Sequence, residues 1–156
     1  MFERSNRLAS VVPPSVSASG SEPQDYIPTV LILDDDEDCR ALVSAVLSNA
    51  GFLVYSLPDG RRVNEILGQY CIDLLVTDIV MPECDGIETI TALRYSHPRL
   101  PVIAISGDAP MNTELYLTIA KKLGAFRVLN KPFRPNQLLA AAREAIMRES
   151  TLTSST

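Results

Sequence analysis

Short apolar runs recur along the middle of the chain and alternate with stretches of mixed polarity. Four runs are continuously apolar, at residues 30–33, 74–76, 102–105 and 128–129, and a fifth at residues 52–55 is less uniform. Apolar residues at consecutive positions, rather than at every second one, are typical of parallel strands covered on both faces. The pattern therefore predicts a five-stranded, parallel sheet that is buried on both sides.

The stretches between these runs carry apolar residues at helical spacing. Helices are predicted near residues 41–49, 87–93, 115–123 and 138–146, and Gly51 and Gly124 stand where the first and third of them should end. Alternation of strand and helix favours the α/β class, with a doubly wound sheet and helices on both of its faces.

The two ends of the chain differ in composition from this alternating region. Residues 1–27 are rich in Ser and Pro, and such a segment buries too little apolar surface to offset the entropy of ordering it. We expect a disordered tail over residues 1–27, one folded domain over residues 28–148 and a flexible C-terminal tail over residues 149–156.

Composition and charge remove several classes of function. The net charge of −5 disfavours nonspecific binding to nucleic acid, and no segment has the roughly 20 apolar residues that a membrane helix requires. The apolar stretch at residues 8–12 is too short for a secretory signal peptide. Cys39, Cys71 and Cys84 form no CxxC pair, so neither a disulfide framework nor a zinc site is indicated. We expect a cytoplasmic protein that binds neither nucleic acid nor a membrane directly.

Polar residues that suit phosphoryl chemistry follow the predicted strands. Asp34 and Asp35 come after the first strand, Asp78 after the third, Ser106 at the end of the fourth and Lys131 after the fifth. In doubly wound sheets the ligand site lies beyond the carboxyl ends of the strands. We therefore expect these five side chains to meet at one edge of the sheet.

This combination has a clear chemical use. Three neighbouring carboxylates repel one another unless a cation neutralises them, and Mg²⁺ favours carboxylates combined with water and phosphate oxygens. A carboxylate is also a nucleophile that forms an acyl phosphate. A metal ion, a lysine and a hydroxyl group stabilise the charge on the transferring phosphoryl group, and Lys131 and Ser106 supply the last two.

Four short motifs give the chain a family resemblance over residues 28–147. They are Leu-Asp-Asp-Asp at 33–36, Thr-Asp-Ile-Val-Met-Pro at 77–82 with Asp-Gly at 85–86, Ile-Ser-Gly at 105–107 and Lys-Pro-Phe at 131–133. In this order and spacing they resemble the receiver domains of two-component response regulators. The Lys-Lys-Leu-Gly-Ala stretch at 121–125 and the non-aromatic residue at 128 resemble, in particular, stand-alone bacterial receivers of the chemotaxis type. The resemblance implies the flavodoxin-like strand order 2-1-3-4-5.

The resemblance also implies a role for each site residue. Asp78 would be the phosphoacceptor, and Ser106 and Lys131 would bind the phosphoryl group and act as the switch. Mg²⁺ would be held by Asp34, Asp35, Asp78 and the backbone carbonyl of Val80. The Lys131–Pro132 peptide would be cis.

Residues around the site invite a hypothesis on rate. Val80, Gly107 and Asp108 would lie beside the phosphorylation site and help to set the rate of dephosphorylation. Val128 stands where many receivers have an aromatic switch residue, and Phe126 lies two positions earlier. Movement of the Ser106 hydroxyl would then reshape the following loop without the usual aromatic partner.

The functional interpretation is a signalling switch rather than an enzyme, since the domain would assist only its own phosphorylation and dephosphorylation. A histidine kinase or histidine phosphotransfer protein would phosphorylate Asp78, and output would pass through protein contacts. One alternative is a pseudo-receiver, a binding module that takes no phosphate. Another is a phosphatase of the haloacid-dehalogenase type, for which Asp34 and Asp36 have the required spacing but Asp38 replaces Thr or Val.

Two further interpretations concern the acidic run at residues 34–38. A calcium loop of the EF-hand type would need glycine in place of Cys39 and glutamate in place of Ala45, so it fails at two positions. The end of the run, from Asp36 to Asp38, is typical of a solvated helix start, because carboxylates favour a helix N-terminus.

Overall fold

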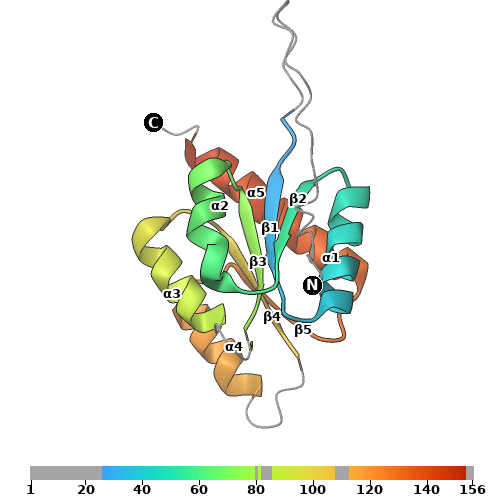
Figure 1. Ribbon diagram of the computed structural model, residues 1–156, viewed down its shortest axis with the longest axis vertical. Helices are drawn as coiled ribbons and strands as arrows, with labels where there is room; N and C mark the ends of the chain where they lie inside the picture. Colours follow the sequence, from blue (N-terminus) through green and yellow to red (C-terminus); the bar gives the residue numbers. More distant parts are fainter. Residues whose placement is uncertain (1–25, 80, 82–85, 108–112, 154–156) are drawn as a thin grey trace, which may run out of the picture.

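Figure 1 shows the computed structural model, which describes residues 26–79, 81, 86–107 and 113–153. Strands and helices alternate through the described chain. Their bounds are β1 Thr29–Leu33, α1 Glu37–Asn49, β2 Leu53–Leu57, η1 Gly60–Arg62, α2 Val63–Gln69, β3 Leu74–Asp78, α3 Gly86–Ser96, β4 Val102–Ser106, α4 Thr113–Lys122, β5 Arg127–Asn130 and α5 Pro135–Thr153.

All five strands form one parallel sheet in the order β2-β1-β3-β4-β5. The predicted fold class and strand order are therefore confirmed. The order reverses direction at β1, which lies between β2 and β3. Leu31, for example, pairs with Tyr55 on one side and with Leu75 on the other. The switch point places the ends of β1 and β3 side by side, which is where such sheets bind ligands.

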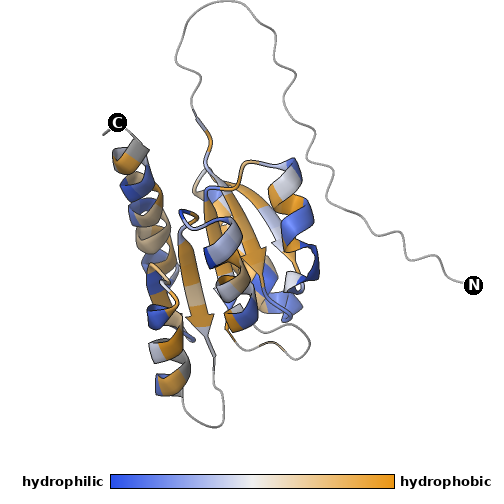
Figure 2. Cartoon of the chain, turned by 90° about the vertical axis from the view of Figure 1, so that its left-hand side faces the viewer, coloured by the Kyte–Doolittle hydropathy of each residue, from blue (hydrophilic) through white to orange (hydrophobic). Residues whose placement is uncertain are grey.

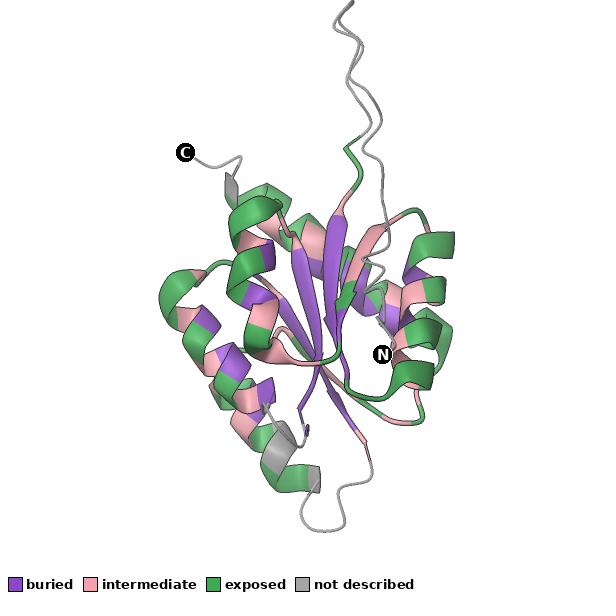
Figure 3. Ribbon diagram, viewed as in Figure 1, coloured by how far each residue is buried: buried purple, intermediate pink, exposed green. Residues whose placement is uncertain are grey.

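Side chains that alternate along each strand pack into two separate cores, one on each face of the sheet. Figure 2 shows that the strands of the sheet consist mainly of hydrophobic residues. On one face, Leu31 and Leu75 pack with residues of α2, α3 and α4, including Ile90. On the other, Val30 and Val76 pack with residues of α1 and α5. Every residue of β1, β3 and β4 is buried (Figure 3), as continuous apolar runs predict for a sheet covered on both faces.

Two helices differ from the sequence prediction. The sequence pattern indicated no helix at α2, which has only seven residues and buries Val63 and Ile66. Its apolar stripe is too short for periodicity to stand out, and packing against the sheet supplies the missing stability. The last helix, α5, continues to Thr153, so residues 149–153 are helical and the predicted C-terminal tail begins inside this helix.

The start of α1 explains why the acidic run divides into two parts. Asp36 is the N-cap of the helix, and its side chain accepts hydrogen bonds from the backbone amides of Asp38 and Cys39. Glu37 and Asp38 occupy the exposed first turn, where the helix dipole favours negative charge. The end of the run therefore serves the helix, and Asp34 and Asp35 remain for the edge of the sheet.

Of the tail over residues 1–27 that the sequence predicts to be disordered, residues 1–25 lie outside the described residues, and Tyr26 and Ile27 are exposed. Among the described helices, none combines the length and apolarity needed to cross a bilayer.

Candidate functional site

Four of the expected site residues lie together at the carboxyl edge of the sheet, where the strands end: Asp34, Asp78, Ser106 and Lys131. Asp35, which directly follows Asp34, lies close to them. Ser106 is the last residue of β4 and pairs with Asn130 at the end of β5. Asp34, Asp78 and Ser106 are buried, with exposed fractions of 2%, 6% and 1%. Polar groups are rarely buried to this degree without hydrogen-bond or charged partners, so the neighbours of these side chains determine their chemistry.

The ammonium group of Lys131 bridges two of the carboxylates. Its Nζ lies 2.9 Å from Oδ2 of Asp78 and 3.4 Å from Oδ2 of Asp34. Burial alone would lower the pKa of Lys131, but the hydrogen bond to Asp78 and the charges of Asp78 and Asp34 outweigh it and raise that pKa above its usual range. Lys131 is therefore a permanent cation at the centre of the site.

The carboxylates exceed what one lysine can neutralise. Asp34, Asp35 and Asp78 each offer an oxygen atom, and these atoms lie within 4.8 Å of one another. Three carboxylates facing one ammonium leave an excess of negative charge that a divalent cation would offset. The all-oxygen donor set, partly exposed through Asp35, fits Mg²⁺, which keeps several water ligands.

Backbone contacts fix the loop that carries the acidic pair. The backbone amide of Asp34 donates to the carbonyl of Leu57 at 3.2 Å. The side-chain Oδ1 of Asp34 accepts from the amide of Asp36 at 2.9 Å. Arg40 donates from Nη1 to the Asp34 carbonyl at 2.7 Å. Nearby, burial and a hydrogen bond to Asp34 raise the pKa of the Cys39 thiol to about 11, which keeps this thiol protonated.

The hydroxyl and the lysine are positioned by a shared backbone contact. The amide of Lys131 donates to the carbonyl of Ser106 at 2.7 Å, so a backbone hydrogen bond joins the ends of β4 and β5 at the site. The Ser106 hydroxyl donates to the carbonyl of Gly107 at 3.4 Å, the long limit of a hydrogen bond. It is thus weakly held. The Lys131–Pro132 peptide is cis, as the resemblance implied.

Gly86 is a site-forming residue whose role the sequence reasoning missed. A Cβ atom at this position would lie 2.0 Å from the carbonyl oxygen of Asp78, far closer than any real contact. The amide of Gly86 donates to the carbonyl of Ile79 at 3.2 Å. Only glycine lets α3 begin this close to the phosphoacceptor candidate. The Asp-Gly pair at residues 85–86 was the available indication.

Of the three residues expected to influence dephosphorylation, Gly107 is described and lies beside the site lysine. A Cβ atom at Gly107 would lie 3.3 Å from Cδ of Lys131, so a side chain there would crowd the lysine. Val80 and Asp108 lie outside the described residues. Val128 and Phe126 are partly buried and pack on opposite faces of the sheet, Val128 with the α2–α4 side and Phe126 with the α1–α5 side.

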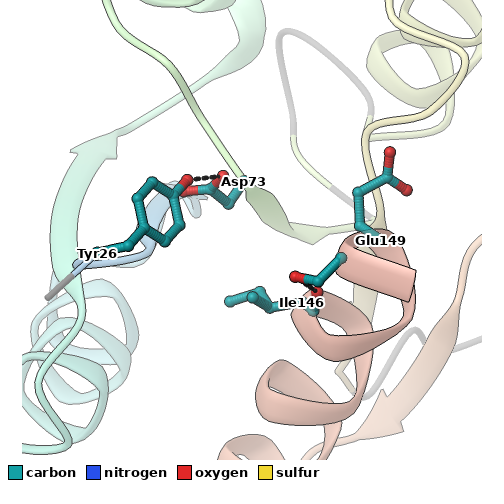
Figure 4. A pocket seen from close by; sticks show the side chains of 5 residues that line it. Tyr26, Asp73, Ile146 and Glu149 are labelled. Carbon is teal, nitrogen blue, oxygen red and sulfur yellow. Dashed lines mark hydrogen bonds between the residues drawn. The ribbon is translucent and has the colours of Figure 1, made fainter. Parts of the chain in front are cut away.

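A separate cavity of about 290 Å³ lies at the opposite, amino edge of the sheet, between Tyr26 and the last turns of α5 (Figure 4). Asp73 lines it, but the Asp73 carboxylate accepts hydrogen bonds from the Tyr26 hydroxyl and, at 2.7 Å, from the amide of Thr29. Asp73 is thereby engaged in joining β1 to β3. The chemistry expected from the sequence therefore belongs to the carboxyl edge.

Comparison with solved structures places this geometry among known proteins. A CheY-like receiver domain protein from Methanospirillum hungatei superimposes with a TM-score of 0.74 at 21% identity, covering 81% of this chain and 98% of its own. At that identity the likeness shows the fold alone. The receiver domain of NtrX from Brucella abortus has a TM-score of 0.70 at 29% identity, covering 76% of this chain and 98% of its own.

Sequence comparison gives the same result. The transcriptional regulatory protein CpxR of Escherichia coli K12 is 37% identical over 121 residues, which are 78% of this chain and 50% of CpxR. The chain thus spans about half the length of this relative. The family model described as "Response regulator receiver domain" matches residues 30–143, which include every proposed site residue. This chain belongs to the family of response regulator receiver domains.

Proposed function

We propose that this receiver domain is switched by Mg²⁺-dependent phosphorylation of Asp78. The observation that carries the proposal is the position of Lys131, whose Nζ lies 2.9 Å from Asp78 within a group of three carboxylates. Receiver domains are signalling domains, and this arrangement supports a phosphoacceptor rather than a hydrolytic enzyme. The domain would assist only the gain and loss of its own phosphoryl group.

The transfer step follows from the residues at the carboxyl edge. A carboxylate oxygen of Asp78 attacks the phosphorus of a phosphohistidine, an O–P bond forms and the N–P bond breaks. The departing imidazole keeps the bonding electron pair and takes up a proton. Mg²⁺, when bound by Asp34, Asp35, Asp78 and the Val80 carbonyl, would supply positive charge beside the transferring oxygens.

Two chain residues would stabilise the product. The Lys131 ammonium would move from the free carboxylate of Asp78 to a phosphoryl oxygen, keeping a charge-assisted hydrogen bond throughout. The Ser106 hydroxyl, whose bond to the Gly107 carbonyl is 3.4 Å long, would turn to donate to another phosphoryl oxygen. Its movement would bias the β4–α4 loop between two arrangements.

The partner and the output are proposed from the same chemistry. A histidine kinase or histidine phosphotransfer protein would supply the phosphoryl group, and α4, β5 and α5 would present the changed surface to an output protein.

We propose a stand-alone receiver of the chemotaxis type that acts in the cytoplasm. CpxR is a transcriptional regulatory protein. A transcriptional role for this domain within a longer assembly is the second candidate.

The test is covalent labelling of Asp78. We expect the mass of one phosphoryl group to be added when the protein is incubated with a small acyl phosphate and Mg²⁺. Asp78→Asn should remain unlabelled, because an amide is not a nucleophile for this reaction, and Asp73→Asn on the opposite edge should label like the wild type. Intact-mass spectrometry reads all three.

Other results would favour the remaining alternatives. A wild-type protein that takes no phosphate from any donor would be a pseudo-receiver. Repeated turnover of a generic phosphate ester would instead indicate a phosphatase.

The hypothesis that Val80 and Asp108 help to set the rate of dephosphorylation has its own test. The phosphorylated forms of Val80→Asn and Asp108→Ala should decay at rates that differ from the wild type, and unchanged lifetimes would remove both residues from that role.

A further inference from the structure

Arg40 makes a contact with the metal-binding loop that the proposed chemistry does not use. This residue lies in the first turns of α1, where its amide donates to the carbonyl of Asp36 at 2.9 Å. Its guanidinium Nη1 donates to the carbonyl of Asp34 at 2.7 Å, a short, charge-assisted hydrogen bond. The side chain thus turns back from the helix onto the backbone just before Asp35.

The bonded carbonyl determines where Asp35 lies. The Asp34 carbonyl and the Asp35 amide belong to one planar peptide. The hydrogen bond from Arg40 to this carbonyl oxygen therefore restricts the orientation of the peptide that leads into Asp35. In the part of the chain that the structure describes, no hydrogen bond to the exposed Asp35 carboxylate is found. Asp34, by contrast, is buried and its carboxylate accepts from the amide of Asp36. The position of Asp35 therefore depends on its backbone.

We propose that Arg40 is a positioning residue for Mg²⁺ binding, acting through the Asp34–Asp35 peptide. The inference rests on the proposed function, since it assigns Arg40 a part in the same metal site. Arg40 would act without being a metal ligand. Its bond to the Asp34 carbonyl would hold the acidic pair in place for Mg²⁺, which tolerates little displacement of its ligands.

Charge and position predict opposite effects when Arg40 is replaced. A guanidinium close to a cation site repels Mg²⁺, so loss of charge alone would tighten metal binding. Loss of the hydrogen bond frees the Asp34–Asp35 peptide and weakens metal binding. The sign of the change in affinity therefore separates a positioning role from a simple electrostatic one.

The experiment measures Mg²⁺ affinity of the full chain by isothermal titration calorimetry, without a phosphodonor. Arg40→Met keeps the aliphatic stem and loses both charge and donor, and we expect about tenfold weaker binding, as for other residues that support a metal ligand. Arg40→Lys retains a charged donor and should bind with intermediate affinity. Arg99→Met, which removes an exposed arginine from the α3–β4 connection, should match the wild type within about twofold.

Each outcome bears on the proposal. Equal or tighter Mg²⁺ binding by Arg40→Met would overturn the positioning role of Arg40. The proposal that Asp78 is phosphorylated would be unaffected. A wild-type chain that binds no Mg²⁺ would overturn the proposed function and this inference together. Thermal unfolding of each variant checks that it is folded. If Arg40→Met is unfolded, Arg40→Lys alone decides, because its charge is unchanged and any loss of affinity reflects position.

Discussion

Strand β3 has an aspartate at each end, and the two have different environments. Asp73, just before the strand, accepts hydrogen bonds from the Tyr26 hydroxyl and from the Thr29 amide, and its own amide donates to the carbonyl of Thr29 at 2.8 Å. Asp78, the last residue of the strand, shares the Lys131 ammonium with Asp34 and lies near Asp35.

The difference shows that neighbours, rather than residue type, separate a carboxylate that joins two strands from one that is suited to the proposed chemistry. Neutral donors satisfy Asp73, which ties β1 to β3 and leaves no demand for a cation. Asp78 lies in a group of three carboxylates around one ammonium, so in the proposed function a cation and a phosphoryl group would both bind there. The contacts at the amino edge join two strands, and the carboxyl edge keeps the electrostatic imbalance on which the proposed function rests.

Gly86→Ala should have the largest effect on the carboxyl edge. The added methyl group would lie 2.0 Å from the carbonyl oxygen of Asp78, so α3 or the end of β3 must move. We expect a loss of about 1–3 kcal/mol or more in the free energy of unfolding, measured by urea denaturation, and slower labelling of Asp78. Gly68→Ala is the matched control, since a methyl group there meets nothing within 4 Å. Equal behaviour of the two variants would mean that close packing does not shape the site.

Lys131→Met should come next, because it removes the cation that offsets two buried carboxylates. We expect a loss of about 1–3 kcal/mol in the free energy of unfolding without Mg²⁺, the usual cost of buried polar groups left unpaired. Mg²⁺ should then raise the melting temperature of this variant more than that of the wild type, since it supplies the missing charge. Lys122→Met, at an exposed position in α4, is the control. Equal gains from Mg²⁺ would indicate that Lys131 does not balance the carboxylates.

Ser106→Ala should leave stability almost unchanged and affect the switch. Among the described residues its hydroxyl makes one hydrogen bond, the 3.4 Å bond to the Gly107 carbonyl, so we expect a change within about 1 kcal/mol in unfolding free energy. Asp78 should still be labelled, but amide NMR shifts in β4 and α4 should change less on phosphorylation than in the wild type. Ser96→Ala, on the exposed surface of α3, should show the full response. A full response in Ser106→Ala would exclude the hydroxyl from switching.

The sequence predicted most strongly those features that depend on consecutive residues. Continuous apolar runs indicate the buried strands, and residues directly after those runs indicate the site, which is why the sequence alone points to Asp78. Contacts between distant segments leave no such pattern. The closeness of Gly86 to the Asp78 backbone and the Arg40 bond to the Asp34 carbonyl depend on how helices pack on the sheet, and α2 was too short to show a helical period.

The same limit applies at the amino edge. Asp73 precedes an apolar run just as Asp78 ends one, and nothing local in the sequence says that Tyr26, 47 residues away, donates to it. The contact depends on the path of the chain into β1. A sequence therefore indicates where acidic residues lie relative to strands, and three-dimensional contacts separate the structural ones from the reactive ones.

Tyr26→Phe should have the smallest effect, and it tests whether Asp73 is engaged as described. Burial, the hydrogen bond to Asp73 and the charge of Asp73 raise the pKa of Tyr26 from 10.0 to about 12. A raised pKa in the folded protein means that folding favours the neutral phenol. This contribution to stability is complete below pH 10 and is lost as the pH rises toward 12. The wild type should therefore lose more stability than Tyr26→Phe between pH 10 and 12.

Ultraviolet titration of tyrosinate measures the same contact directly. The difference between wild type and Tyr26→Phe isolates one phenol, which should ionise near pH 12, and Asp73→Asn should move this ionisation toward pH 10. If Tyr26 ionised near pH 10, its ordinary value, Asp73 would lack a firm neutral donor. Its carboxylate would then be as available as that of Asp78, and charge balance would no longer distinguish the two ends of β3.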